Sequence, residues 1–107
     1  MVRVGGEDGL YAAWTKGSAA LLLAARELAG AEGVGDMLTA EWELSQPGLG
    51  VSHAAAERSA ATKGWRWTAE MNQIAASMAA AGLPDGFHLA AAEMFVRFPR
   101  PVPDSRE

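Results

Sequence analysis

The sequence predicts an all-α fold: a single helical bundle of about five helices with a long first helix. Half of the 107 residues are hydrophobic but only 7% are aromatic, so small apolar side chains, mostly alanine, supply the core. Alanine favours helices, whereas strands are rich in branched and aromatic residues. In two long segments, apolar residues recur alternately three and four positions apart, which places them on one helix face. The chain length suits one domain with one core.

The first helix is expected from about residue 8 to residue 32. Its apolar stripe consists of Leu10, Trp14, Gly17, Leu21, Ala24 and Leu28. At about 1.5 Å per residue, the helix would be roughly 37 Å long. A compact domain of this size has a diameter of roughly 34 Å. The helix would therefore span its own domain, and its stripe needs a surface that covers it.

A short second helix is expected from residue 37 to about residue 44. Three glycines, Gly30, Gly33 and Gly35, precede it and are typical of a helix end. Asp36 is a suitable N-cap, and the turn residues Pro47 and Gly48 end the helix.

A long third helix follows, from Ser52 as its N-cap to about residue 81. Its stripe consists of Ala60, Gly64, Trp67, Met71, Ile74, Met78 and Ala81. Gly64 marks either a kink or a close crossing. Two stripes of this kind predict antiparallel helices that pack at a shallow angle.

The last helix starts after Gly82 and Pro84, the residues expected at a helix end and a helix start. Its core face carries Phe87, Ala91, Met94 and Phe98. We therefore divide the chain into a flexible N-terminal segment (1–9), a helical domain (10–98) and a proline-rich polar tail (99–107).

The composition argues against several classes of partner. The net charge is -4 and the nine Lys and Arg residues are scattered, which disfavours nucleic acid and an anionic membrane surface. The longest uncharged apolar run, residues 17–25, is too short to span a membrane. There is no cysteine, and the two histidines, His53 and His88, lie on different predicted helices, so no metal site is expected. We expect both histidines at the surface or capping a helix, and a cytoplasmic protein, since no signal-peptide core is present.

The candidate substrate-cleft residues are Tyr11, Thr15, Ser18 and Trp65. The first three form a polar stripe at the head of the first helix, where the hydroxyls either bond to carbonyls one turn earlier or face a cleft. Trp65 lies about 200° around the helix from Trp67, at about 100° per residue. It is therefore either covered by another helix or part of a ligand pocket. Lys16 points elsewhere and is expected to be solvated.

No residue is expected to bind a cofactor, because the glycine cluster at residues 4–9 lacks the GxGxxG spacing of a dinucleotide site. A stripe of five or six apolar residues would form a sizeable exposed patch on a monomer. We therefore predict a homodimer in which either the first or the third helix crosses the subunit boundary. The interface candidates are Trp14, Leu21, Leu28, Trp67, Met71 and Met78.

Three segments carry a resemblance to a known family: YAAWTKGSAALLLAARELA, the linking EW..SQPG, and GWRWTAEMNQIAASMAAAGLPDGFH. Together they resemble the C-terminal helical domain of 6-phosphogluconate-dehydrogenase-like NAD(P)-binding oxidoreductases, which are relatives of β-hydroxyacid dehydrogenases and imine reductases. The resemblance covers nearly all of residues 10–98. It implies that a Rossmann domain, in cis or in trans, binds NADP or NAD and faces this domain across a cleft. It also implies that the long first helix bridges the two domains and that the helical domains dimerise.

The sequence departs from that family at the expected catalytic positions. The family usually has a lysine about one turn before Tyr11 and an asparagine soon after it, whereas this chain has Asp8 and Ala12. Thr15 stands where the phosphogluconate enzymes have an acid. We therefore expect the substrate-side and dimerisation half of a dehydrogenase-like protein, without its cofactor domain and inactive alone. The alternatives are a free-standing homo-oligomerisation or interaction module and, less strongly supported, a small-ligand binder.

Overall fold

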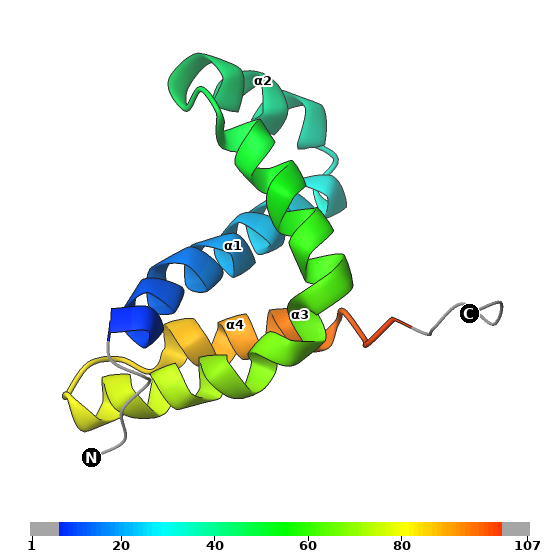
Figure 1. Ribbon diagram of the computed structural model, residues 1–107. Coiled ribbons are helices and arrows are strands. Elements are labelled where there is room, and N and C mark those ends of the chain that lie inside the picture. The colour runs from blue at the N-terminus through cyan, green and yellow to red at the C-terminus, as the bar shows by residue number, and fades with distance from the viewer. Residues whose placement is uncertain (1–6, 102–107) are drawn as a thin grey trace, which may run out of the picture.

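The computed structural model describes residues 7–101, which contain four helices (Figure 1). They are α1 (Glu7–Ala31), α2 (Gly35–Ser45), α3 (Leu49–Ala80) and α4 (Gly86–Val96). The all-α prediction is confirmed, but the described residues form four helices rather than about five. The long third segment continues as one helix through Gly64, and Figure 1 shows that α3 bends near its middle.

Gly64 lies where the bent part of α3 meets the segment after α4. A Cβ atom at this position would be 3.0 Å from the Cβ of Phe98 and 3.5 Å from the Cβ of Ala60. Glycine therefore permits a close approach that a larger residue would obstruct. The two alternatives for Gly64, a kink and a close crossing, occur together.

Three helix starts differ from the predictions. Residues 7–9, assigned to a flexible segment, form the first turn of α1, while residues 1–6 lie outside the described range. α2 begins at Gly35 and α3 at Leu49, ahead of the expected starts. Neither helix has a side-chain cap, so Asp36 and Ser52 lie inside the first turns instead of capping them.

Two glycines end helices as expected. Gly33 follows α1 with a φ of 76°, and Gly82 follows α3 with a φ of 79°. The residue after each glycine donates a backbone hydrogen bond to the carbonyl five residues earlier. The N–H of Val34 bonds to the carbonyl of Ala29, and the N–H of Leu83 bonds to the carbonyl of Met78, both at 2.8 Å. These bonds satisfy carbonyls at the helix end, and the left-handed backbone that they require suits glycine.

The core lies where α4 packs between α1 and the second half of α3. Phe95, Met71 and Ile74 are its largest fully buried side chains. Trp67 packs edge-on against Phe95, with ring centroids 5.0 Å apart. Burial of each large side chain contributes about 1.5–3 kcal/mol, so this part of the molecule is the most firmly packed.

Two contacts show that α1 and α4 run in the same direction. His88, early in α4, bonds to the carbonyl of Ala13, while Arg97, just after α4, pairs with Glu27. By contrast, α1 runs antiparallel to α3. These arrangements leave α2 and the first half of α3 as an arm that rises from the body (Figure 1).

The molecule is flat, with extents of 44 × 44 × 23 Å and a radius of gyration of 15.4 Å. A compact chain of this length would have a radius of gyration of about 13 Å. At about 1.5 Å per residue, α1 runs along most of the longer dimension. Among residues 7–101, no helix has the length and apolar character that a membrane crossing requires.

Candidate functional site

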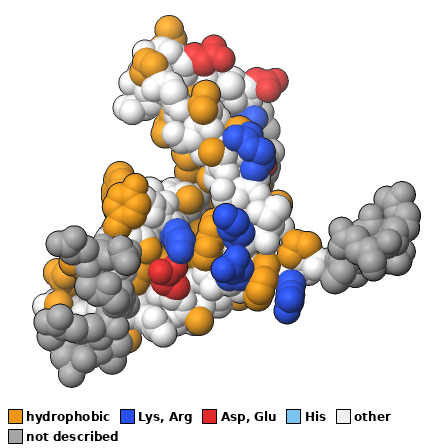
Figure 2. All heavy atoms as spheres, viewed as in Figure 1, with side chains coloured by type: hydrophobic (Ala, Val, Ile, Leu, Met, Phe, Trp, Pro, Cys, Tyr) orange, Lys and Arg blue, Asp and Glu red, His pale blue; other side chains and the backbone are white. Residues whose placement is uncertain are grey.

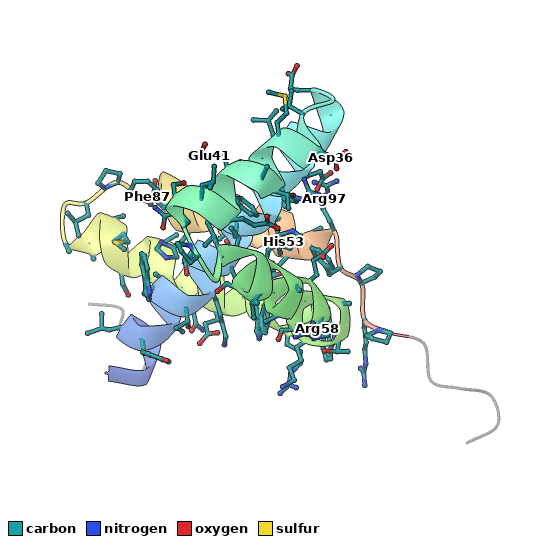
Figure 3. The ribbon with its side chains drawn as sticks, turned by 90° about the horizontal axis from the view of Figure 1, so that it is seen from above. Asp36, Glu41, His53, Arg58, Phe87 and Arg97 are labelled. Atoms are coloured by element: carbon teal, nitrogen blue, oxygen red, sulfur yellow. The ribbon has the colours of Figure 1, made fainter. Side chains whose placement is uncertain are left out.

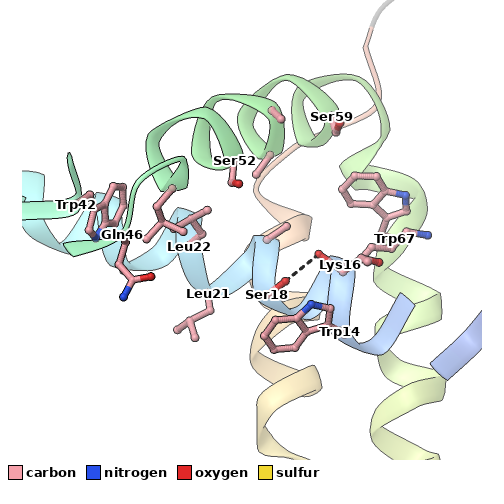
Figure 4. Close-up of a pocket in the computed structure, with 16 residues that line it drawn as sticks. Trp14, Lys16, Ser18, Leu21, Leu22, Trp42, Gln46, Ser52, Ser59 and Trp67 are labelled. Atoms are coloured by element: carbon pink, nitrogen blue, oxygen red, sulfur yellow. Dashed lines mark hydrogen bonds between the residues drawn. The ribbon is translucent and has the colours of Figure 1, made fainter. Parts of the chain in front are cut away.

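A cleft of about 900 Å³ lies between α1 and the arm formed by α2 and the first half of α3. Three tryptophans line it, Trp14, Trp42 and Trp67, together with Gln46 and several serines. Figure 4 shows Trp42 and Gln46 at one end, Trp67 at the other, and Ser52 and Ser59 along the α3 side. In Figure 2 a notch separates the arm from the body, with hydrophobic side chains on its rim.

Lys16 is the charged residue in the lining of this cleft. Its Nζ lies 2.5 Å from Oε1 of Glu70 on α3 and 5.3 Å from the centre of the Trp67 ring. Both charged side chains are about one third exposed. The expectation of a solvated lysine was therefore wrong, because Glu70 and the face of Trp67 hold the ammonium group at the cleft wall.

The hydroxyls of Thr15 and Ser18 both bond to backbone carbonyls within α1. Thr15 donates to the carbonyl of Tyr11 at 3.1 Å, and Ser18 donates to the carbonyl of Thr15 at 3.2 Å. Both side chains nevertheless line the cleft. Each hydroxyl oxygen keeps capacity to accept a bond from a ligand, so the back-bonded and the cleft-facing alternatives both describe these residues.

Two other cleft candidates lie elsewhere. Tyr11 is 72% exposed and is not among the residues that line the cleft. Trp65 also lies outside it, where its indole N–H donates to the carbonyl of Thr62 and the Arg100 guanidinium stacks 4.8 Å from its ring centre. The structure brings Thr15 and Ser18 together with Lys16, but not with Tyr11 or Trp65.

The apolar stripe of α1 is uncovered. Its four large residues, Leu10, Trp14, Leu21 and Leu28, are between 62% and 74% exposed. On the opposite face, Ala12, Ala20 and Leu23 pack into the core. The interface candidates Trp14, Leu21 and Leu28 are therefore all at the surface.

The stripe of α3 has a different environment. Met71 is fully buried, and Trp67 and Met78 are partly buried against the core. This burial corrects our inclusion of Met71 among the interface residues, because the core of the same chain covers it. Of the two stripes, the one on α1 is the surface available to a partner.

A second cavity, of about 690 Å³, lies on the other side of the stripe, between α1 and α4. Small residues such as Gly17 and Ala24 form much of its lining, and Phe87 stands at its edge. Trp14 and Leu21 line both cavities. The exposed stripe of α1 therefore lies between the two cavities and forms part of the wall of each.

His88 is buried at the base of this second cavity, which corrects the expectation of a surface or capping residue. Its Nε2 lies 2.9 Å from the carbonyl oxygen of Ala13, so Nε2 carries the proton and donates it. Its Nδ1 is buried without a hydrogen-bond partner in the described part of the chain. His53, the other histidine, packs against Trp42 and lies 3.5 Å from Glu57.

Within residues 7–101, no group of three or more His, Cys, Asp or Glu side chains could hold a metal ion. Most of the glycine cluster at 4–9 lies outside the described range, and Glu7 to Gly9 form part of α1. The described site thus offers one ammonium group, hydroxyls and aromatic faces. These groups can bind and orient a ligand.

Sequence reasoning missed two features of the site. Lys16 and Glu70 are 54 positions apart, and each lies on a polar face of its own helix, so no local pattern pairs them. His88 was missed because its partner is a backbone carbonyl, which no side-chain motif reveals. The sequence feature that indicates this contact is Gly17, because a glycine in an apolar stripe leaves room for a side chain of another helix to approach.

The comparison with known proteins gives one family. The model described as "Domain of unknown function (DUF1932)" matches residues 29–98, which include α2, α3 and α4. No match was found among curated proteins or solved structures. The matching family is the C-terminal helical domain of 6-phosphogluconate-dehydrogenase-like NAD(P)-binding oxidoreductases, relatives of the imine reductases. The resemblance seen in the sequence is confirmed, and the chain belongs to this family of C-terminal domains from dehydrogenase-like proteins.

Proposed function

We propose that this chain is the substrate-side and dimerisation half of an NAD(P)-dependent dehydrogenase-like protein, and that it is inactive alone. Its partner in catalysis would be a Rossmann domain, in cis or in trans, that binds NADP or NAD. The observation that carries the proposal is the open cleft beside α1, which three tryptophans line and at whose wall Glu70 and Trp67 hold the ammonium group of Lys16. Family membership supports the same reading.

In this proposal the cleft residues hold the substrate while the bound nicotinamide supplies hydride. An ammonium group has three N–H donors, and Glu70 accepts one of them from Lys16, which leaves two for a carbonyl oxygen or an imine nitrogen. Ser18 and Thr15 add hydroxyl oxygens one turn apart. The tryptophans would surround an apolar part of the substrate and exclude water, which strengthens polar contacts within the cleft.

The proposal explains why the domain would not catalyse alone. A cleft that is open on one side cannot exclude water until a second wall closes it. Hydride transfer also needs a nicotinamide, and the described helices contain no glycine-rich strand-to-helix turn that would bind its pyrophosphate. Tight NADPH binding by this chain, measured by fluorescence titration, would contradict the proposal.

Reconstitution in trans tests the proposal directly. The chain is mixed with a separately expressed Rossmann domain, and NADPH oxidation is followed with small carbonyl or imine substrates. We expect turnover only in the mixture. Lys16→Met should reduce turnover by about 10²-fold or more, the effect expected when one donor positioned at the reacting oxygen or nitrogen is removed.

Lys63→Met provides a matched control for this experiment. Lys63 is also on a helix and is exposed, but it does not line the cleft. We expect this variant to keep the rescued turnover. Turnover that Lys16→Met and Lys63→Met leave equally unchanged would refute the role given to the cleft.

The second candidate is a free-standing homo-oligomerisation or interaction module, which the uncovered α1 stripe favours. This alternative also predicts an oligomer, so assembly alone cannot separate the two. It predicts no turnover with any Rossmann domain, whereas the first proposal predicts rescue by the matching one.

A further inference from the structure

The Lys and Arg residues of the described chain fall into two groups. The first group is held within the fold by an acidic side chain or a backbone carbonyl, and it consists of Lys16, Arg26 and Arg97. The second group is exposed and pairs with no carboxylate of residues 7–101; it consists of Arg58, Lys63, Arg66 and Arg100. The uncompensated positive charge of the described Lys and Arg residues is therefore confined to this second group.

These four residues lie together where α3 bends. Arg58, Thr62 and Arg66 follow one another at intervals of four residues, which places them on one face of α3, and Lys63 is three residues before Arg66. Arg100, in the segment after α4, reaches α3 at Trp65. Figure 2 shows several Lys and Arg side chains close together over this part of the molecule. We call the four cationic residues and Trp65 the basic patch.

Trp65 holds two of the four cations in place. The guanidinium carbon of Arg100 is 4.8 Å from the centre of the Trp65 ring, and that of Arg66 is 5.9 Å from it. The indole itself is anchored, because its N–H donates to the carbonyl of Thr62 at 3.1 Å. A guanidinium that stacks on a ring keeps the N–H groups at its edge free, and these can bind a carboxylate through two parallel hydrogen bonds.

We infer that the basic patch binds an acidic segment of another protein, whose carboxylates meet the guanidinium groups of Arg66 and Arg100. Arg and Trp are enriched in the centre of protein interfaces and among the residues that carry most of the binding energy. The stacking on Trp65 fixes both guanidinium groups before the partner arrives, which lowers the entropy lost on binding. The inference is independent of the proposed function, since no residue of the basic patch lines the cleft.

A protein segment suits the basic patch better than nucleic acid does. Nucleic acid carries a charge at every nucleotide, and its binders contact many phosphates, roughly six to ten. The basic patch offers four cations on a chain whose net charge is -4, so the rest of the chain would repel a long polyanion. A short acidic segment places its charges on the four cations alone.

The test measures the affinity of the full chain for a fluorescein-labelled oligoglutamate peptide, by fluorescence anisotropy at low ionic strength. Arg66→Gln and Arg100→Gln should each raise the dissociation constant by about threefold, and the double variant by about tenfold, as expected for exposed charge pairs. Trp65→Leu should also weaken binding although it changes no charge, because both guanidinium groups lose the ring that holds them.

Arg97→Gln is the matched control. It removes the same charge from an exposed arginine, but Arg97 pairs with Glu27. Figure 3 shows Arg97 well apart from Arg58. We expect this variant to bind the peptide as the wild type does. All the substituted side chains are exposed, so the helical fold should persist in every variant, and circular dichroism checks that it does.

Four results would overturn the inference. The first is a wild-type chain that does not bind the peptide, and the second is an effect of Arg97→Gln as large as that of Arg66→Gln, since net charge alone would then govern binding. The third is tighter binding of a labelled single-stranded oligonucleotide than of the peptide. The fourth is self-association at low ionic strength that Arg66→Gln prevents, because a second copy of the chain would then occupy the basic patch. The reconstitution assay judges the cleft in each case.

Discussion

Gly17 allows His88 to reach the backbone of α1. A Cβ atom at position 17 would lie 2.9 Å from Nε2 of His88, closer than real Cβ contacts. The ring cannot simply move aside, because it is buried and bonded to the carbonyl of Ala13. One missing side chain on α1 therefore permits the hydrogen bond that joins α1 to α4.

Gly17→Ala should destabilise the fold by about 1–3 kcal/mol, the usual cost of inserting a methyl group into a packed site. Gly30→Ala, in the same helix, is the control, since a Cβ there would meet nothing within 4 Å. It should leave stability unchanged or raise it by up to about 1 kcal/mol. Urea unfolding measures both, at a low chain concentration where self-association contributes little to the measured stability. Equal stability of the two variants would contradict the role of Gly17.

At the residue scale, the sequence predicted what depends on local spacing. The back-bonds of Thr15 and Ser18 follow from hydroxyls three and four residues from their acceptors. Lys16 and His88 could not be placed in this way, because their partners lie on other helices. The contacts between helices that build the site depend on packing, which no single segment encodes.

At the element scale, α2 differs from the other helices. It has no buried residue, although Trp42 and Leu38 are partly covered. It lies between two left-handed glycines, Gly33 and Gly48, and contributes Trp42 to the cleft wall. With so little apolar burial, α2 is held mainly by its own hydrogen bonds and a few side-chain contacts.

We therefore predict that α2 opens locally more readily than the body. Amides of α2 should exchange with deuterium at least about tenfold faster than those around Met71, Ile74 and Phe95, which lie in the packed core. Hydrogen exchange followed by mass spectrometry gives both rates in one experiment. Equal protection of α2 and the core would contradict this account of how α2 is held.

The all-α class and the order of the four helices were predictable from apolar periodicity and glycine positions, but the expected number of about five helices was too high for the described residues. The helix starts at Gly35 and Leu49 were missed because no side chain caps them. The bend of α3 was only suggested by Gly64, since a sequence shows a small residue but not the Phe98 side chain that approaches it.

At the scale of the whole molecule, the length of α1 and its stripe predicted an uncovered surface, and the structure contains one. The core is built from the opposite face of α1, from α4 and from the second half of α3. The stripe residues consequently stay exposed between the cleft, which Lys16 lines, and the second cavity, which His88 lines. We propose that the cleft lined by Lys16 binds the substrate.

Light scattering on the purified chain over a range of concentrations shows whether this domain assembles through the exposed stripe of α1. We expect a particle of twice the 11.2 kDa chain mass. At the same concentration, the Leu21→Ser variant should form less of this particle, because Leu21 is an exposed residue of the α1 stripe. A clean 11.2 kDa monomer at high concentration would show that the exposed α1 stripe does not mediate assembly.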